Sequence, residues 1–140
     1  MIILDSDHVS VVLESRHSLR PRLLARLDQA FDDVALPIVT AEEQLRGWLA
    51  QINRQRDIRR QIVPYSRLVE LLKFMEGWTI LNWNDETASW FEHLRAARVR
   101  IGTQDLKIAS ITLANNGLLL SANLRDFEKV PGLNVEDWLR

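Results

Sequence analysis

Short apolar runs alternate along the chain with longer segments in which apolar residues recur every three or four positions. The short runs predict strands over residues 2–4, 34–39, 79–83 and 118–122, and a short edge strand over 134–138. The longer segments predict helices over about 7–14, 19–31, 41–60, 66–76, 85–98 and 103–116. Strands that alternate with helices are typical of a parallel sheet covered by helices. The pattern therefore predicts an α/β fold.

Prolines and glycines mark the expected ends of several elements. Pro37 lies inside the second predicted strand, which is unfavourable because proline cannot donate to the ladder of a sheet. Thr40 is expected to begin the long helix, and Pro64 is expected to end it. Gly77 and Gly117 follow two other helices, as glycine commonly does. These positions divide the chain into elements without indicating a linker.

Composition favours one ordinary folded domain spanning residues 1–140. The length is close to the commonest domain size, 46% of the residues are hydrophobic and 26% are charged. The absence of cysteine excludes disulfides, thiolate zinc sites and cysteine nucleophiles, and fits a reducing compartment. No apolar run approaches about 18 residues, and the N-terminus does not look like a signal peptide. We therefore expect a cytoplasmic protein without membrane spans.

The chain as a whole has a formal net charge of −1, so nucleic-acid binding would need a local basic patch. The stretch from Arg46 to Arg67 is a candidate, because it holds six arginines and one acid, Asp57. The same stretch is also compatible with a solvated helix face that binds nothing.

Acidic and amide side chains follow the predicted strands, at the edge where α/β folds usually carry their functional groups. They are Asp5, Glu42, Glu43, Asn123 and Asp126, and Asp105 begins the helix before the fourth strand. Carboxylates brought together repel one another, and a divalent cation relieves that repulsion. Oxygen ligands suit Mg²⁺ or Mn²⁺, which can activate a phosphodiester for hydrolysis. The sequence therefore suggests a metal-assisted nuclease site.

Each of these residues also has a structural interpretation. Asp5 can simply end a strand, and Thr40 with Glu43 forms a capping-box pattern that stabilises a helix start. Asp105 suits the N-terminal dipole of its helix, and Asn123 and Asp126 suit a turn. Asp7 is expected to cap a helix. His8, His17 and His93 lack metal-ligand spacing and are expected to pack in the core or to lie at the surface.

Four blocks of sequence resemble the PIN-domain ribonucleases, and among them the VapC-type toxins of toxin–antitoxin pairs. They are ILDSDHVS at residues 3–10, TAEEQLRG at 40–47, IGTQDLKIA at 101–109 and LLLSANLRDFEKVPGLNVEDW at 118–138. The blocks span nearly the whole chain in the family's order. The resemblance implies a PIN-like three-layer sandwich, in which helices flank a central parallel sheet with an acid cluster at its carboxyl edge.

The resemblance also implies roles for individual residues. Asp5, Glu43 and Asp105 match the family's metal-ligating acids, with Glu43 a better match than Glu42 because it lies four residues before Gly47. Asn123 falls where a fourth acid often lies, and this amide argues against a second tightly held metal. Asp126 would either supply the missing charge or hold the loop.

The function implied by the resemblance is a Mg²⁺- or Mn²⁺-dependent endoribonuclease toxin. Its substrate would be RNA, with transfer RNA suggested by the family, and its partners an inhibitory antitoxin and a second copy in a homodimer. Two alternatives remain open. The segment Asp5-Ser6-Asp7-His8-Val9 also fits the start of haloacid-dehalogenase-like phosphatases, in which the first aspartate is phosphorylated. The second alternative is a degenerate PIN domain that only binds RNA or protein.

Overall fold

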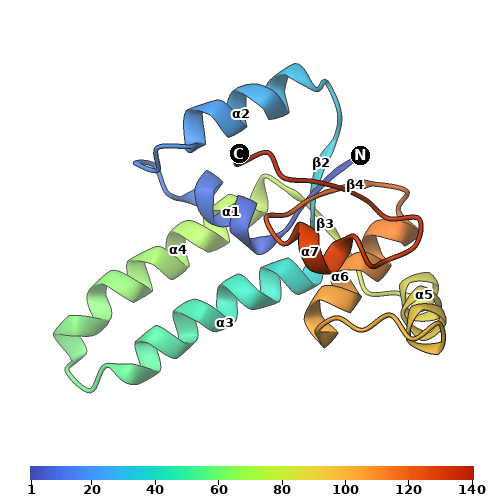
Figure 1. Ribbon diagram of the computed structural model, residues 1–140. Coiled ribbons are helices and arrows are strands. Elements are labelled where there is room, and N and C mark those ends of the chain that lie inside the picture. The colour runs from blue at the N-terminus through green and yellow to red at the C-terminus, as the bar shows by residue number, and fades with distance from the viewer.

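The centre of the molecule is a five-stranded sheet in which every pairing is parallel. A computed structural model describes all residues, 1–140 (Figure 1). The strands lie in the order β3-β2-β1-β4-β5. Their bounds are Ile2–Leu4 for β1, Val34–Pro37 for β2, Thr79–Leu81 for β3, Leu118–Leu120 for β4 and Asn134–Glu136 for β5. The predicted parallel sheet is confirmed, and it places β1 at its centre.

The helices follow the strands as the pattern predicted. They are α1 (Ser6–Leu13), α2 (Arg20–Gln29), α3 (Ile38–Arg54), the 3₁₀ helix η1 (Ile58–Gln61), α4 (Ile62–Glu76), α5 (Asp85–Ala96), α6 (Thr103–Ala114) and α7 (Leu124–Phe127). None of them is long and apolar enough to cross a membrane.

The three layers follow from the alternation of side chains along the central strands. Ile3 points to one face of the sheet, where it joins a core with residues of α5 and α6 such as Leu94 and Ile108. Ile2 and Leu4 point to the other face, where they join residues of α1 and α2. Because β1 is buried on both faces, it reads as a continuous apolar run rather than as an alternating one. The three-layer α/β architecture expected from the sequence is therefore confirmed.

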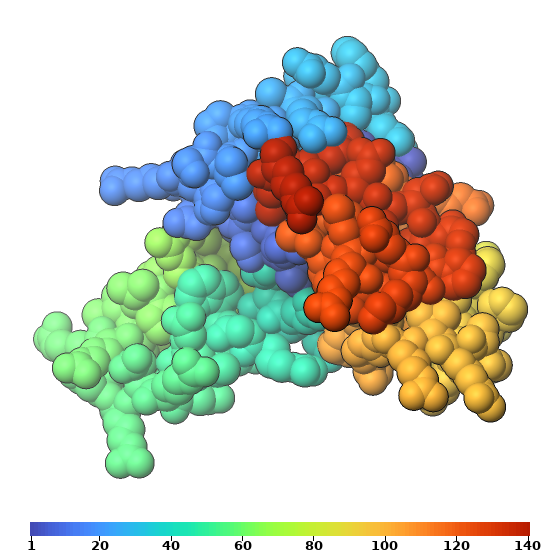
Figure 2. All heavy atoms as spheres, viewed as in Figure 1, coloured from blue at the N-terminus to red at the C-terminus, as the bar shows by residue number.

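One pair of helices extends well beyond the sheet. α3 and α4 pack against each other and are joined by η1 at the far end (Figure 1). In the space-filling view this hairpin projects from one side of the molecule, and long side chains extend into solvent from its tip (Figure 2). The start of α3 remains at the carboxyl edge of the sheet, so the hairpin reaches outward from that edge.

The start of α3 differs from the prediction. β2 ends at Pro37, and the helix already begins at Ile38, so the predicted strand over 34–39 is two residues too long. Proline is tolerated because it lies at the last position of the strand, where it also precedes the first helical turn. Thr40 is not the cap but lies inside the helix, fully buried, and its hydroxyl donates to the Leu4 carbonyl at 3.2 Å. The interpretation of Thr40 and Glu43 as a capping box is wrong.

Other boundaries also differ, and β3, β4 and β5 each end two residues earlier than predicted. α3 ends at Arg54 rather than near residue 60, and α4 begins at Ile62 rather than Ser66. Pro64 falls in the first turn of α4, where an amide hydrogen would have no partner within the helix, so it starts a helix rather than ending one. Helix α5 begins at Asp85 as expected, and Asn84 and Thr87 form a capping box at its start.

Candidate functional site

Asp5 lies at the carboxyl end of the central strand, where β1 turns into α1. Its backbone is extended, as an N-cap requires, and its Oδ1 accepts the amide hydrogen of Ser6 at 2.7 Å. Its Oδ2 accepts the hydroxyl hydrogen of Ser121 at 2.7 Å, from the segment that follows β4. Only 6% of the residue is exposed. Two neighbouring strands thus bring Asp5 and Ser121 together, although they are 116 positions apart.

Asn123 connects the remaining acids of the β4 edge. Its Nδ2 donates to Asp105 Oδ2 at 3.0 Å and to Asp126 Oδ2 at 3.1 Å. Its own backbone amide donates to Ser121 Oγ at 3.0 Å. The side chains of Asp5, Asp105, Asn123 and Asp126 therefore belong to one hydrogen-bonded network centred on Ser121 and Asn123.

Glu43 reaches this network from α3. The Ser6 hydroxyl donates to Glu43 Oε2, and Ser6 directly follows Asp5. Glu42 points elsewhere: it is exposed and accepts from Arg46 at 2.9 Å and from Gln104 at 3.0 Å. The structure thus separates the two adjacent glutamates, and the one at the network is the one that the family pattern favours.

Burial and mutual repulsion make this network hard to ionise. The pKa of Asp5 is raised to about 7, first because the carboxyl is buried and then because Asp7 and Asp105 lie nearby. The pKa of Asp105 is raised mainly by burial and also by Asp126 and Asp7. The pKa of Asp126 is lowered, chiefly by the hydrogen bond from Asn123. The inner part of the network is therefore the part where negative charge is most costly.

No lysine or arginine compensates that charge. Among the ion pairs of the chain, Lys129 contacts Asp126 at 3.4 Å and Arg46 contacts Glu42 at 2.9 Å, both at the outside. Neither Asp5 nor Asp105 has a basic ion-pair partner. Uncompensated carboxylates in this number are suited to a divalent cation with oxygen ligands.

The carboxylates are nevertheless occupied by hydrogen bonds. No group of three or more Asp, Glu or His side chains is arranged at the distances of a finished metal site. Ser6, Ser121 and Asn123 occupy oxygens of Glu43, Asp5 and Asp105. The donor chemistry fits a hard cation, and the side chains would have to release some of these contacts to bind it.

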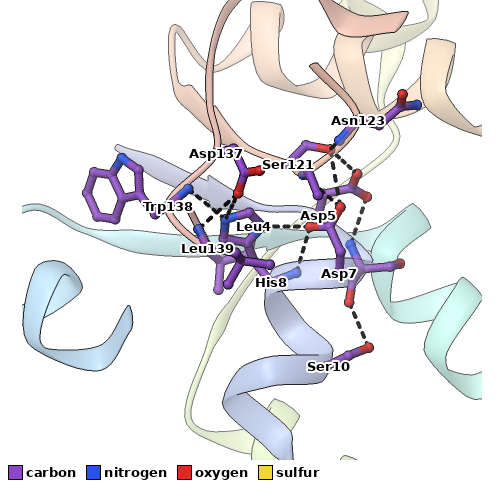
Figure 3. Close-up of polar contacts among 12 residues, drawn as sticks. Leu4, Asp5, Asp7, His8, Ser10, Ser121, Asn123, Asp137, Trp138 and Leu139 are labelled. Atoms are coloured by element: carbon purple, nitrogen blue, oxygen red, sulfur yellow. Dashed lines mark hydrogen bonds and ion pairs between the residues drawn. The ribbon is translucent and has the colours of Figure 1, made fainter. Parts of the chain in front are cut away.

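Asp7 and His8 also belong to the site. The prediction that Asp7 caps a helix is wrong, because Asp7 lies inside α1 and Asp5 is its N-cap. Asp7 Oδ2 accepts the amide hydrogen of Ala122 at 2.8 Å, beside Ser121, and Asp7 lies close enough to raise the pKa of Asp5 (Figure 3). His8 is fully buried and contacts Asp7 through Nδ1 at 2.5 Å. The signal for Asp7 was present, since it is the second acid of Asp5-Ser6-Asp7 directly after a buried strand. For His8 no local pattern distinguished it from a packed core histidine.

A charge added at Asn123 should destabilise the protein when no metal is present. Asn123→Asp removes both N–H donors and places a third carboxylate between Asp105 and Asp126, so we expect a loss of about 1–3 kcal/mol at pH 7. Urea unfolding in EDTA measures this loss. Asn53→Asp, at an exposed position of α3, is the control for the substitution itself. Equal stability of Asn123→Asp and wild type would contradict the bridging role of the amide.

Comparison with known proteins gives a consistent relationship. No model of a known protein family matches the chain. It is 25% identical to ribonuclease VapC2 of Haemophilus influenzae over 141 residues, which covers 98% of this chain and 97% of that protein. It is 28% identical to the tRNA(fMet)-specific endonuclease VapC of Salmonella typhimurium over 83 residues, covering 56% of this chain and 63% of that protein.

The fold is similar to that in the crystal structure of DNA-bound VapBC from Salmonella typhimurium. The TM-score is 0.77 at 20% identity, and the match covers 98% of this chain and 97% of that one. At this level of identity the structural likeness establishes the fold. Together with the full-length sequence relative, it confirms the resemblance to VapC-type PIN ribonucleases that the four sequence blocks carried.

Proposed function

We propose that this chain is an endoribonuclease toxin that hydrolyses RNA phosphodiester bonds with a divalent cation. The observation that carries the proposal is the single network joining Glu43, Asp5, Asp105 and Asp126 at the carboxyl edge of the sheet, without a basic partner at its centre. The relationship to ribonucleases along the full chain supports the same reaction.

Asp5, Glu43 and Asp105 are the residues that would hold Mg²⁺ or Mn²⁺. When bound, such a cation supplies Lewis-acid activation of the phosphodiester and of the attacking water. Asn123 fixes Asp105 and Asp126 relative to each other through one amide group. Ser6 and Ser121 hold Glu43 and Asp5 through hydroxyl groups, which can rotate to release a carboxylate oxygen.

The α3–α4 hairpin offers a surface for the RNA backbone. Arg54, Arg56, Arg59 and Arg60 are exposed at or near its tip, and none of them forms an ion pair. Arg54 lies 11 positions beyond Glu43 in the same helix, which corresponds to roughly 16 Å along its axis. Arginines at that distance would neutralise phosphates remote from the cleaved bond, and binding would weaken with salt. A folded RNA such as a transfer RNA is long enough to reach both regions.

A protein partner, the antitoxin expected from the resemblance, could approach the acids through two adjoining hollows. One hollow of about 320 Å³ lies among α1, α3 and α4, and a second of about 250 Å³ adjoins it and reaches Ser6 and Glu43. Gln44 and Trp48 line both. A segment seated in the first hollow would therefore cover the approach to Glu43. A homodimer remains a prediction from the resemblance.

The proposal requires that RNA cleavage depend on the cation. We expect the purified chain, free of partner, to cut total RNA into discrete fragments with Mg²⁺ or Mn²⁺, to stop in EDTA and to recover when excess cation is added back. Intact RNA across a broad panel, with well-folded protein and cation present, would count against the nuclease.

The same experiment addresses the two alternatives. In a phosphatase of the haloacid-dehalogenase type the first aspartate is the nucleophile, and a lysine is expected near it. Of the three lysines in the chain, Lys129 contacts Asp126, Lys107 lies over Trp83, and no lysine is paired with Asp5. Turnover of a generic phosphate monoester would favour that enzyme. RNA binding without cation or cleavage would favour a degenerate binding module.

A further inference from the structure

The buried histidine beside the acid network has a defined tautomer. His8 Nε2 lies 3.2 Å from the backbone nitrogen of Trp138, whose amide hydrogen can only be donated (Figure 3). Nε2 must therefore be the unprotonated nitrogen, and Nδ1 carries the hydrogen. Nδ1 lies 2.5 Å from Asp7 Oδ1, to which it donates. Asp137 Oδ1 is 3.8 Å from Nε2, too far to compete as a hydrogen-bond partner.

Asp7 is fixed on both of its oxygens. Oδ1 accepts from His8 Nδ1 and also from the His8 backbone amide at 2.7 Å. Oδ2 accepts the amide hydrogen of Ala122 at 2.8 Å, one residue before Asn123. The carboxylate is thereby held beside Asp5 and aimed at the loop that follows β4.

Trp138, whose backbone amide donates to His8 Nε2, is also held in place by its surroundings. Trp138 is 8% exposed and packs into the core on the α1–α2 face of the sheet. The Arg26 guanidinium lies 4.2 Å from the centre of its ring, and its Nε1 donates to Glu136 at 2.6 Å. Asp137 accepts the Leu139 amide hydrogen at 2.9 Å. The backbone amide of Trp138 is therefore presented to His8 by a packed turn, residues 137–139, that forms no hydrogen bond or ion pair with Asp5, Glu43, Asp105 or Asp126.

We propose that His8 is a positioning residue that transmits the placement of the 137–139 turn to the Asp7 carboxylate, and that this turn is thereby part of the cation-binding machinery. The inference rests on the proposed function. Groups that hydrogen-bond to the residues around a metal site fix the orientation of those residues, and mutation of such outer groups typically costs 10–100-fold in metal affinity or activity. His8 would act in this way through Asp7, which lies beside Asp5.

Two substitutions separate the two contacts of His8. His8→Asn keeps an N–H donor near the position of Nδ1 and loses the acceptor for Trp138. His8→Gln keeps a side-chain amide near the position of Nε2 and loses the donor to Asp7. Asparagine is one methylene shorter than glutamine and leaves the larger cavity at this buried position, so a purely structural role predicts the larger loss of stability for His8→Asn and unchanged cation affinity in both variants.

We expect His8→Gln to bind Mn²⁺ about 10–100-fold more weakly than wild type, measured by calorimetry, and to lower kcat with little change in KM for RNA. His8→Asn should retain more of the Mn²⁺ affinity than His8→Gln, although its smaller side chain should lower the melting temperature more. In an Asp7→Asn background, His8→Gln should have no further effect on Mn²⁺ affinity, because His8 acts through Asp7. Equal affinity of His8→Gln and wild type would overturn the inference.

NMR of the wild-type protein tests the inference even if the variants fail to fold. The chain has three histidines, so the ¹⁵N resonances of His8 can be compared with those of His17 and His93. We expect the Nδ1–H tautomer at His8, and a shift of its resonances alone when Mg²⁺ is added. An Nε2–H tautomer, or no shift at saturating Mg²⁺, would overturn the inference and leave the nuclease intact. Failure of wild type to bind either cation would overturn the proposed function and the inference with it.

Discussion

Replacing Asp5 with Asn should abolish RNA cleavage and make the folded protein more stable. Asp5 lies at the centre of the proposed site, and loss of its charge removes one of the three acids that would hold the cation. Loss of a residue that only hydrogen-bonds to a metal ligand typically costs 10–100-fold, so the loss for Asp5→Asn should exceed about 100-fold in kcat/KM.

The gain in stability follows from the pKa of Asp5, which burial and the neighbouring acids raise to about 7 from an ordinary 3.8. Between these two values the folded protein binds more protons than the unfolded chain, so this carboxyl makes stability fall as pH rises through that window. Above pH 7 the penalty is complete. Each pKa unit corresponds to about 1.4 kcal/mol, which limits the penalty to about 4 kcal/mol.

Asparagine avoids this penalty while keeping the local contacts. Its Oδ1 can accept from the Ser6 amide, and its Nδ2 can donate to Ser121 Oγ, whose own hydrogen is then free for Asp7 Oδ2 at 3.4 Å. Urea unfolding in EDTA should therefore show Asp5→Asn to be more stable than wild type by about 1–4 kcal/mol at pH 8, and by less at pH 5.

The control for this prediction is Asp33→Asn, an exposed aspartate without side-chain hydrogen bonds, which should change neither activity nor the pH dependence of stability. A variant Asp5→Asn that loses stability at pH 8 would show that the carboxylate is compensated in the folded protein. Retained cleavage would remove Asp5 from the reaction.

The fold could be predicted from the sequence because its periodicities are local. The apolar run of β1 and the helical spacing of α2 and α6 each specify an element within a few residues, and their alternation predicts a parallel sheet. The boundary at Pro37 was misplaced because tertiary contact outweighs capping preference: Thr40 is held inside α3 by the Leu4 carbonyl. Helix α7, with four residues, is too short to show any periodicity.

The site could be predicted only in part, because some of its contacts join positions that are far apart in the sequence. Asp5, Asn123 and Asp126 follow strands, so their convergence at one edge follows from parallel pairing. The side chains that connect these acids could not be predicted. Ser121 binds an aspartate 116 positions away, and His8 binds a backbone amide 130 positions away. Contacts at such separation exist only after the sheet has formed, and nothing in a single sequence distinguishes these residues from ordinary polar or buried ones.

Glu42 and Glu43 provide the sharpest test of the proposed site, because they are adjacent and chemically identical. Glu43→Gln should reduce RNA cleavage by more than about 100-fold, whereas Glu42→Gln should leave it within a few-fold of wild type. Glu43 joins the network through the Ser6 hydroxyl, while Glu42 is exposed and paired with Arg46 and Gln104.

Each substitution removes one negative charge from the same helical turn, so long-range electrostatic attraction of RNA changes equally in both. Any difference in cleavage must therefore come from the position of the side chain. Calorimetry with Mn²⁺ should show the same ranking, with weaker binding only for Glu43→Gln. The melting temperatures should change little in either variant, since neither glutamate is buried. Equal activities of the two variants would mean that α3 contributes no ligand, and the cation would then have to be held by Asp5, Asp7 and Asp105 alone.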